Sequence, residues 1–249
     1  MSEVLYAVGE GVATLTLNAP ERRNAFTAAM VEEFLEACAA ADADPSVGAV
    51  LVRAEGESFC AGAHRASLAE AGRDPAESGR FRGLGLTYSA FVRVGDLLAP
   101  SIAAVRGHAV GAGVNLMLAT DVRIVAEAAR IMSGFLRIGL HPGGGHFALL
   151  GRLAGREAAA AMSVFGEEID GRRAAELGLA WAAVPEAEVE PRALELARRV
   201  AADPELARAA ARSLRLELGP PAVPWPAALE LEKAVQMWSL RRRAENQPP

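Results

Sequence analysis

Short apolar segments alternate with segments of helical periodicity along much of this chain, and this alternation most limits the folds that it can adopt. Residues 12–17 and 101–105 are short and apolar, as expected of buried strands. Between them, residues 27–41 repeat apolar side chains at helical spacing behind Thr27, a candidate N-cap. Strands that alternate with helices predict an α/β fold with crossover connections.

The expected elements divide the chain into an α/β core over residues 1–190 and a helical region over residues 191–249. The expected strands cover residues 12–17, 47–52, 101–105, 121–126, 129–133 and 180–184. The expected helices cover residues 27–41, 80–98, 111–119, 147–153, 157–165, 171–177, 191–202, 204–218 and 226–243. Helices therefore dominate the second half of the chain.

Composition narrows the partners and the compartment. The chain has 249 residues, of which 51% are hydrophobic, and this is ample for one large core. A net charge of −5 without a long basic run argues against a nucleic-acid surface. No uncharged apolar run reaches the length of a membrane span, so no membrane association is expected. Two cysteines without a secretory signal predict reduced thiols in a cytoplasmic protein.

Three glycine-rich or small-residue segments each stand just before an expected helix: residues 60–64, 107–113 and 142–146. A Walker loop is excluded because it ends in Gly-Lys-Ser/Thr, and the chain's only lysine is Lys233. A dinucleotide fingerprint is excluded because Leu116 stands where its third glycine would be. The chain has no Gly-x-Ser-x-Gly motif, and its histidines lack metal-site spacing, so no metal site is expected.

One chemical use of such segments remains. Small residues let a ligand approach backbone N–H groups closely, and a helix N-terminus adds N–H groups without acceptors. Two such turns together could direct two donors at one carbonyl oxygen, which is an oxyanion hole. The alternative is that the segments are tight turns that pack helices on strands.

The order of five motifs resembles the enoyl-CoA hydratase/isomerase (crotonase) superfamily. In sequence order they are Leu-Asn-Ala-Pro-Glu-Arg-Arg-Asn-Ala-Phe at 17–26, Ser-Phe-Cys-Ala-Gly-Ala at 58–63, the segment Ile-Ala-Ala-Val-Arg-Gly-His-Ala-Val-Gly-Ala-Gly at 102–113, Ala-Thr-Asp-Val-Arg-Ile at 119–124, and Gly-Leu-His-Pro-Gly-Gly-Gly at 139–145. The resemblance runs from about residue 3 to the C-terminus. Each motif alone is weak, but their order is specific.

The resemblance implies a spiral of ββα units, with a C-terminal helical region that takes part in forming a homotrimer or a dimer of trimers. It also implies an acyl-CoA thioester as ligand, so that coenzyme A enters as part of the substrate and no cofactor stays bound. The oxyanion donors would be the backbone N–H groups of Ala63 and Ala112.

The same resemblance implies where coenzyme A would lie. The adenine and pantetheine path would follow the first motif and the turn at residue 61. The residues expected in or beside this path are Arg23, Ala25, Phe26, Cys60, Ala61, Gly62, His108 and Gly111. Arg241, Arg242 and Arg243 could contact CoA phosphates, or could be a charged helix end that favours its dipole.

The chain departs from the family at the two glutamates that hydratases use. By position, Asn115 and Phe135 stand where the glutamates are expected. Neither side chain can act as a general base at neutral pH, and hydration needs both an activated water and a delivered proton. The loss of both glutamates argues against ordinary hydration. It leaves the expected oxyanion hole unchanged, because the donors there are backbone N–H groups.

Histidines are the remaining candidates for proton transfer, because all four lie in or beside the motifs. His141 and His64 are the candidate proton handlers, and the alternative is that they hold loops by hydrogen bonds. The sequence thus favours an enoyl-CoA hydratase/isomerase-like enzyme, a lyase or isomerase of CoA thioesters. The alternatives are a non-catalytic acyl-CoA-binding or carrier protein, and a divergent CoA lyase or hydrolase that uses histidine.

Overall fold

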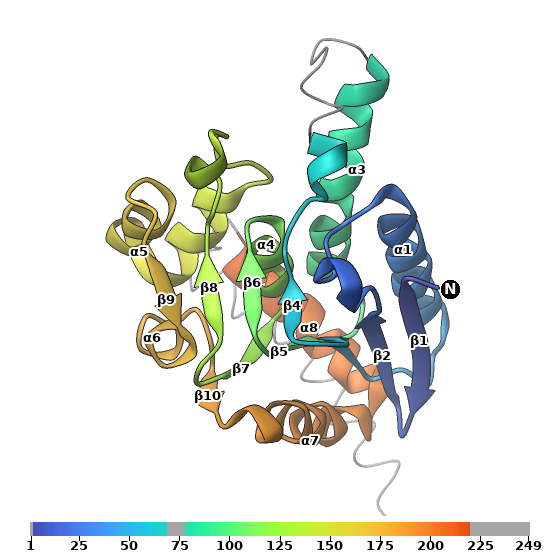
Figure 1. The fold of residues 1–249 in the computed structure, drawn as a ribbon. Coiled ribbons are helices and arrows are strands. Elements are labelled where there is room, and N and C mark those ends of the chain that lie inside the picture. Colours follow the sequence, from blue (N-terminus) through green and yellow to red (C-terminus); the bar gives the residue numbers. More distant parts are fainter. Residues whose placement is uncertain (1, 69–77, 220–249) are drawn as a thin grey trace, which may run out of the picture.

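The strands form two sheets in a computed structural model that describes residues 2–68 and 78–219 (Figure 1). The six-stranded sheet has the order β1 (Val4–Gly9), β2 (Val12–Leu17), β3 (Ala49–Ala54), β5 (Ser101–Val105), β7 (Val122–Ala126) and β10 (Ala182–Val184). The four-stranded sheet has the order β4 (Ser58–Cys60), β6 (His108–Val110), β8 (Arg130–Met132) and β9 (Glu168–Asp170). One edge pair of each sheet, β1 with β2 and β8 with β9, is antiparallel, and the other pairs are parallel.

Helices follow pairs of strands along the chain. The α-helices are α1 (Ala28–Ala43), α3 (Ser78–Gly95), α4 (Ala112–Ala119), α5 (His146–Ser163), α6 (Gly171–Glu176), α7 (Val189–Ala201) and α8 (Pro204–Leu218). The 3-10 turns are η1 (Pro20–Arg22), η2 (Leu136–Ile138) and η3 (Glu186–Glu188). The expected helix at 226–243 and Arg241–Arg243 lie outside the described residues.

A strand–strand–helix unit repeats along the middle of the chain. The units are β3-β4-α3, β5-β6-α4 and β7-β8-α5, and each gives its first strand to the large sheet and its second to the small one. This confirms the α/β prediction and the ββα repeat. The repeat matters for the site because it stacks the second strands of successive units side by side.

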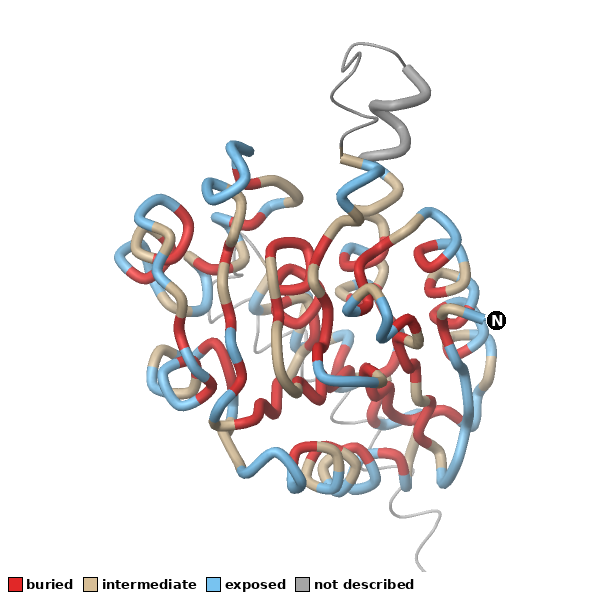
Figure 2. Tube along the Cα trace, in the orientation of Figure 1, coloured by how far each residue is buried: buried red, intermediate tan, exposed pale blue. Residues whose placement is uncertain are grey.

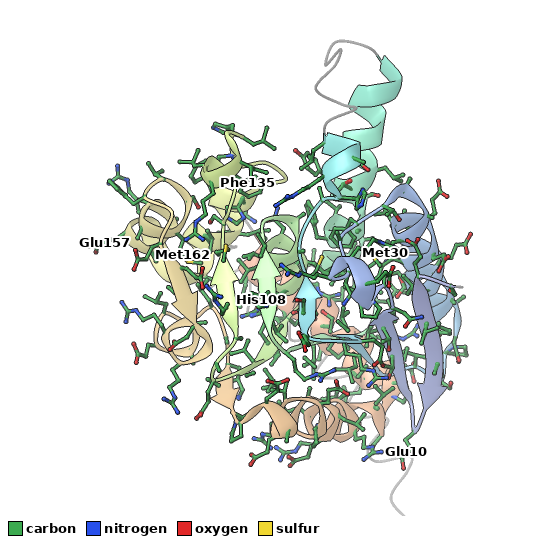
Figure 3. The ribbon with its side chains drawn as sticks, viewed as in Figure 1. Glu10, Met30, His108, Phe135, Glu157 and Met162 are labelled. Carbon is green, nitrogen blue, oxygen red and sulfur yellow. The ribbon has the colours of Figure 1, made fainter. Side chains whose placement is uncertain are left out.

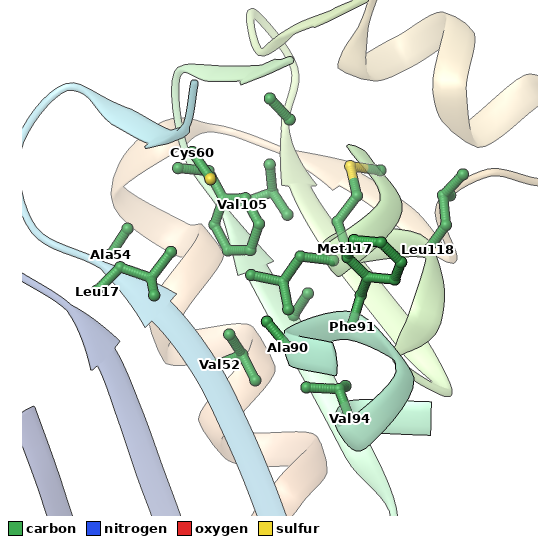
Figure 4. Packing of buried hydrophobic residues seen from close by; sticks show 14 of the residues in the cluster. Leu17, Val52, Ala54, Cys60, Ala90, Phe91, Val94, Val105, Met117 and Leu118 are labelled. Carbon is green, nitrogen blue, oxygen red and sulfur yellow. The ribbon is translucent and has the colours of Figure 1, made fainter. Parts of the chain in front are cut away.

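The central strands β2, β3, β5 and β7 of the large sheet are buried on both faces, as is usual for parallel strands, whereas most of β1 at the edge is exposed. On β3, Ala49 and Leu51 pack in a cluster with the α7 residues Val189, Ala193, Ala197 and Ala201. The alternate residues Val50 and Val52 belong to the main core on the other side, where Figure 4 shows Val52. α4 and the central strands are accordingly buried, whereas β1 and the outward faces of α5 and α6 are exposed (Figure 2). Period-2 alternation thus assigns each face of β3 to one cluster.

Several expected boundaries shift in the structure. The expected helices 147–153 and 157–165 are two parts of α5, which breaks its helical geometry at Gly155, where φ is +81°. The short strands β4, β6 and β9 were not expected, because three residues carry no readable period. The expected domain boundary at residue 190 falls inside α7, which packs on the large sheet, and the division remains a prediction. Within the described residues no helix is long and apolar enough to cross a bilayer.

Candidate active site

The carboxyl ends of three parallel strands meet at one edge of the small sheet. β4 pairs with β6 and β6 with β8, all parallel, so the segments that follow Cys60, Val110 and Met132 leave the sheet on the same side. Ligands of α/β proteins bind at such carboxyl edges. Two of the motif segments singled out in the sequence therefore converge because of the strand direction.

A cavity of about 370 Å³ lies at this edge. Its residues come from the turns after the three strands, from α3, from α4 and from the segment before α5. They are Ala61, Gly62, Ala63, Arg65, Leu68, Thr87, Tyr88, Val110, Gly111, Ala112, Asn115, Ser133, Gly134, Phe135, Ile138, Leu140, His141 and Gly143. The volume lies in the range typical of small-molecule sites. A second, larger hollow of about 790 Å³ lies over α5, β9 and α6, and it contains none of the candidate site residues.

The turn after β4 and the turn after β6 are in close contact. A Cβ atom on Gly62 would lie 2.7 Å from the carbonyl oxygen of Val110 and 3.3 Å from the nitrogen of Ala112. A Cβ atom on Gly113 would lie 2.2 Å from the carbonyl oxygen of Cys60. Only glycine permits both approaches, since real Cβ contacts are longer. The two glycines thus bring the backbones of Ala63 and Ala112 to one cavity.

The N–H groups of these two alanines are not used by the neighbouring secondary structure. Ala112 is the first residue of α4, so its N–H has no acceptor within the helix. Around Ala63, the N–H of Phe26 donates to Gly62 O and the N–H of His64 donates to Phe26 O. In a parallel bridge of this kind, the N–H between the two bonds points to the other side of the strand. Both groups are therefore candidate donors to a ligand.

A buried hydrogen-bond network surrounds Asn115. Its Nδ2 donates to Gly143 O at 3.0 Å and to Gly144 O at 3.3 Å. Its Oδ1 lies 2.6 Å from His146 Nδ1, and His146 Nε2 lies 2.6 Å from Ser133 Oγ. Asn115 and His146 are each 1% exposed. Burial lowers the pKa of His146 to about 4, so this imidazole is neutral at pH 7.

Phe135, which stands where the sequence predicts the second hydratase glutamate, lies just beyond the carboxyl end of β8 (Figure 3). Its ring packs edge-on against His146, with ring centroids 5.0 Å apart. A Cβ atom on Gly111 would lie 3.5 Å from Phe135 Cζ, so the ring also covers the turn that precedes α4. An apolar ring therefore lines the cavity at a position where a hydratase is expected to carry a carboxylate.

His141 lines the cavity from the segment before α5, and it is exposed. Its Nδ1 lies 2.6 Å from Pro142 O. A carbonyl oxygen can only accept, so Nδ1 carries the proton and Nε2 is the basic nitrogen of the neutral ring. Phe147 meets the ring edge-on at 5.9 Å. His141 is thus a basic group with access to both the cavity and solvent.

Three of the predicted residues, His108, His64 and Cys60, do not line the cavity. His108 is at the amino end of β6, opposite the cavity edge, near Ser58 (Figure 3). His64 follows Ala63 but is not among the described lining residues. Cys60 is buried beneath the turn, and burial raises the pKa of its thiol to about 12.

The first motif lies against the turn after β4. Ala61 N–H donates to Arg23 O, and Phe26 N–H donates to Gly62 O. The buried side chain of Asn24 fixes this arrangement by donating to Ser58 O and accepting from Ala19 N–H. Arg23 is exposed, whereas Ala25 and Phe26 are buried. The first motif thus contacts Ala61, which lines the cavity.

The electrostatic character of the cavity is positive. Arg65 is the one formally charged side chain among the described lining residues, and none of these residues carries a carboxylate. The N-terminus of α4 adds the positive end of a helix dipole. Glu127 and Glu168 are paired elsewhere, with Arg172 and with Arg130. The cavity therefore suits a ligand with a negative or developing negative charge.

Sequence reasoning missed the serines of the network around Asn115. Ser133 follows β8 and is 2% exposed, and its Oγ also lies 3.2 Å from Ser163 Oγ at the end of α5. Nothing in the sequence marks these serines, because their contact with His146 depends on how α5 packs. Tyr88 of α3 was not missed in this way: it lines the cavity, and a Cβ atom on Gly143 would lie 2.5 Å from its hydroxyl oxygen.

Comparison with known proteins identifies relatives that span most of the chain. A sequence model of the enoyl-CoA hydratase/isomerase family matches residues 7–236. A probable enoyl-CoA hydratase of Mycobacterium tuberculosis, EchA14, is 41% identical over 231 residues, covering 92% of this chain and 86% of the relative. The 1,2-epoxyphenylacetyl-CoA isomerase of Escherichia coli is 34% identical over 209 residues, covering 82% of this chain and 78% of the relative. The crystal structure of an enoyl-CoA hydratase from Polaromonas sp. JS666 is similar with a TM-score of 0.86 at 26% identity, covering 95% of this chain and 91% of that one.

Proposed function

The chain belongs to the enoyl-CoA hydratase/isomerase family, and from this premise we propose that it polarises the carbonyl of an acyl-CoA thioester between the backbone N–H groups of Ala63 and Ala112. The observation that carries the proposal is the contact between the two turns, in which Gly62 lies against Ala112 N at the edge of one cavity. Donors fixed in place before reaction stabilise the charge that develops on the thioester oxygen. The predicted crotonase-like fold is confirmed by the family's solved structures.

The proposed chemistry is of the enolate type, with His141 as the proton handler. Nε2 of this ring is the basic nitrogen, since Nδ1–H is held by Pro142 O. A base in this position could move a proton at Cα while the thioester oxygen carries the charge. Coenzyme A enters as part of the substrate, along the first motif beside Ala61. A homotrimer or dimer of trimers remains part of this proposal.

A second candidate function is acyl-CoA binding without turnover. The observation that favours it is the absence of a carboxylate among the described residues of the cavity, together with the Phe135 ring at the second glutamate position. Hydration would then lack a general base, while the oxyanion donors and the apolar walls would still hold a thioester. A further alternative is a divergent CoA lyase or hydrolase, which would lack hydratase activity but would still use His141 in catalysis.

Turnover of crotonyl-CoA and of longer enoyl-CoAs distinguishes the candidates. Catalysis by His141 predicts that His141→Ala lowers kcat by about 10²–10⁴-fold, the range of general acid–base catalysis, with thioester binding kept. His64→Ala is the matched control, because His64 does not line the cavity, and it should change kcat little. Tight binding with no turnover would instead support the binding protein. Turnover that neither substitution affects would contradict histidine catalysis.

A further inference from the structure

The two carbonyl groups that contact Asn115 fix the direction of every hydrogen bond in the buried network. Carbonyl oxygens only accept, so the atom that faces Gly143 O and Gly144 O must be Nδ2. Oδ1 then faces His146, and it can only accept, so His146 carries its proton on Nδ1. His146 Nε2 is therefore unprotonated in the neutral ring and accepts from the hydroxyl of Ser133.

The network joins segments that are far apart in the sequence. Asn115 belongs to α4, Ser133 follows β8, and Ser163 lies at the end of α5. Ser133 donates to His146, so its oxygen is left to accept from Ser163 Oγ at 3.2 Å. All of these side chains are at most 2% exposed. The chain of donors thus runs in one direction, from Ser163 to the carbonyls of Gly143 and Gly144.

The two glycines at the end of this chain form a tightly packed part of the cavity boundary. A Cβ atom on Gly143 would lie 2.5 Å from Tyr88 Oη, and one on Gly144 would lie 2.5 Å from Phe91 Cζ. The segment is therefore packed against α3 on one side and held by Asn115 on the other. Both Gly143 and Tyr88 line the cavity. The position of the Gly143–Gly144 segment therefore sets the shape of the space that is open to an acyl group.

We propose that His146 is a positioning residue that, through Asn115, holds the Gly143–Gly144 segment in place for acyl binding, and that residue 115 takes no part in proton transfer. The inference rests on the proposed function, since it assigns the cavity to the acyl group. Every polar atom of Asn115 already has a partner within the protein. The position that carries a glutamate in hydratases is a structural support in this chain.

The first experiment compares the affinities of octanoyl-CoA and of free CoA, measured by titration calorimetry. Free CoA reports the CoA path alone, whereas the ratio of the two affinities reports the acyl cavity. We expect His146→Leu to lower this ratio about tenfold, because it leaves Asn115 Oδ1 and the Ser133 hydroxyl without partners. The affinity for free CoA should stay within about twofold. His146→Gln is the matched control, since its amide can donate to Asn115 and accept from Ser133.

The ratio separates positioning from a merely structural role. If His146 only stabilised the fold, partial unfolding would lower both affinities equally and leave the ratio unchanged. A folded His146→Leu protein with the wild-type ratio overturns the inference. A wild-type protein that binds octanoyl-CoA no more tightly than CoA contradicts the proposed function itself. The two failures are therefore distinguishable.

Two further measurements apply even if His146→Leu does not fold. In the wild-type protein, ¹⁵N NMR of labelled histidine at pH 7 should find the His146 proton on Nδ1, and a proton on Nε2 overturns the directed network. Asn115→Asp keeps the shape but turns a carboxylate toward two carbonyl oxygens, so it should lower the affinity ratio and gain no crotonyl-CoA hydration. A gain of hydration would show that residue 115 can serve in proton transfer and would overturn that part of the inference.

Discussion

Gly62 and Gly113 allow the turns after β4 and β6 to come into contact, because neither residue has a Cβ atom. The carbonyl oxygen of Cys60 occupies the space where a side chain on Gly113 would begin. Glycine at this position also leaves the N-terminus of α4 free to approach β4. The candidate oxyanion site therefore requires a residue without a side chain at position 113, as well as the two N–H donors.

Gly113→Ala should destabilise the protein by about 3 kcal/mol, because its Cβ would lie 2.2 Å from Cys60 O and the backbone must move. The measurement is urea unfolding followed by circular dichroism. Gly151→Ala in α5 is the control, since a Cβ there has no atom within 4 Å and alanine favours a helix by about 0.5–1 kcal/mol. Equal effects of the two substitutions would contradict the close contact.

The sequence predicted the candidate residues unevenly, for physical reasons. Ala63, Ala112 and His141 could be named because they belong to motifs whose order is recognisable. The structure places all three in the lining of one cavity, and their roles remain predictions. His108 does not line the cavity, because it stands at the amino end of β6. Only the fold reveals this position. Ser133 and Ser163 could not be found at all, since a hydrogen bond between distant segments leaves no local pattern in the sequence.

At the level of secondary structure, prediction succeeded for most of the longer elements, although the six-residue strand β1 was not expected. The expected N-cap of α1 is confirmed, since Thr27 Oγ accepts from Met30 N–H at 3.0 Å. The break between the expected helices 147–153 and 157–165 corresponds to the departure from helical geometry at Gly155. The three-residue strands β4, β6 and β8 position the site, yet β4 and β6 lacked a recognisable signal, because alternation needs more residues.

Thr27→Ala should lower the free energy of unfolding by about 1–2 kcal/mol, because α1 loses its cap and Glu3 loses the hydroxyl that donates to it at 2.6 Å. Thr27→Ser keeps the hydroxyl and should cost far less. Thermal and urea unfolding measure both variants. A loss in Thr27→Ser as large as in Thr27→Ala would show that the methyl group, and not the cap, stabilises α1.

At the scale of the whole molecule, three ββα units place three strand ends at one edge, and the cavity follows from that arrangement. The fold class could be predicted from alternation and motif order. The pairing of strands into two sheets could not, because the strands of the small sheet are too short to show a pattern. The packing of α5 against α4 then buries His146, and this burial makes the stability of the protein depend on pH.

Stability should fall by about 2 kcal/mol between pH 7 and pH 5 through His146 alone. Burial holds its pKa at about 4 in the folded protein, whereas the unfolded chain titrates near 6.5. Above pH 6.5 the ring is neutral in both states and the contribution is complete. As the pH falls below 6.5, the unfolded state binds the proton first, so stability is lost. Urea unfolding across this range measures it.

His146→Gln provides the comparison for this pH dependence. Glutamine does not titrate, so the difference in unfolding free energy between wild type and variant should shrink as the pH falls from 7 to 5. Subtracting the two curves removes the contribution of the carboxylates, which is common to both proteins. A difference that stays constant across the range would mean that His146 titrates alike in the folded and unfolded states.

A proline substitution can remove the candidate N–H donor of Ala112 without a large change in α4. Ala112 is the first residue of α4, a position where proline is tolerated because the N–H has no helical partner. Ala112→Pro therefore deletes the candidate donor itself, and Ala112→Ser keeps it with a small side chain. The pair of variants isolates a single N–H group.

The most direct test is the ¹³C NMR resonance of the thioester carbonyl in bound [1-¹³C]octanoyl-CoA. Two N–H donors withdraw electrons from this carbonyl, so the resonance should move downfield on binding to the wild-type protein and to Ala112→Ser. In Ala112→Pro the bound thioester should lose much of that shift. A bound carbonyl with the resonance of the free thioester, or one that Ala112→Pro leaves unchanged, would contradict the oxyanion site.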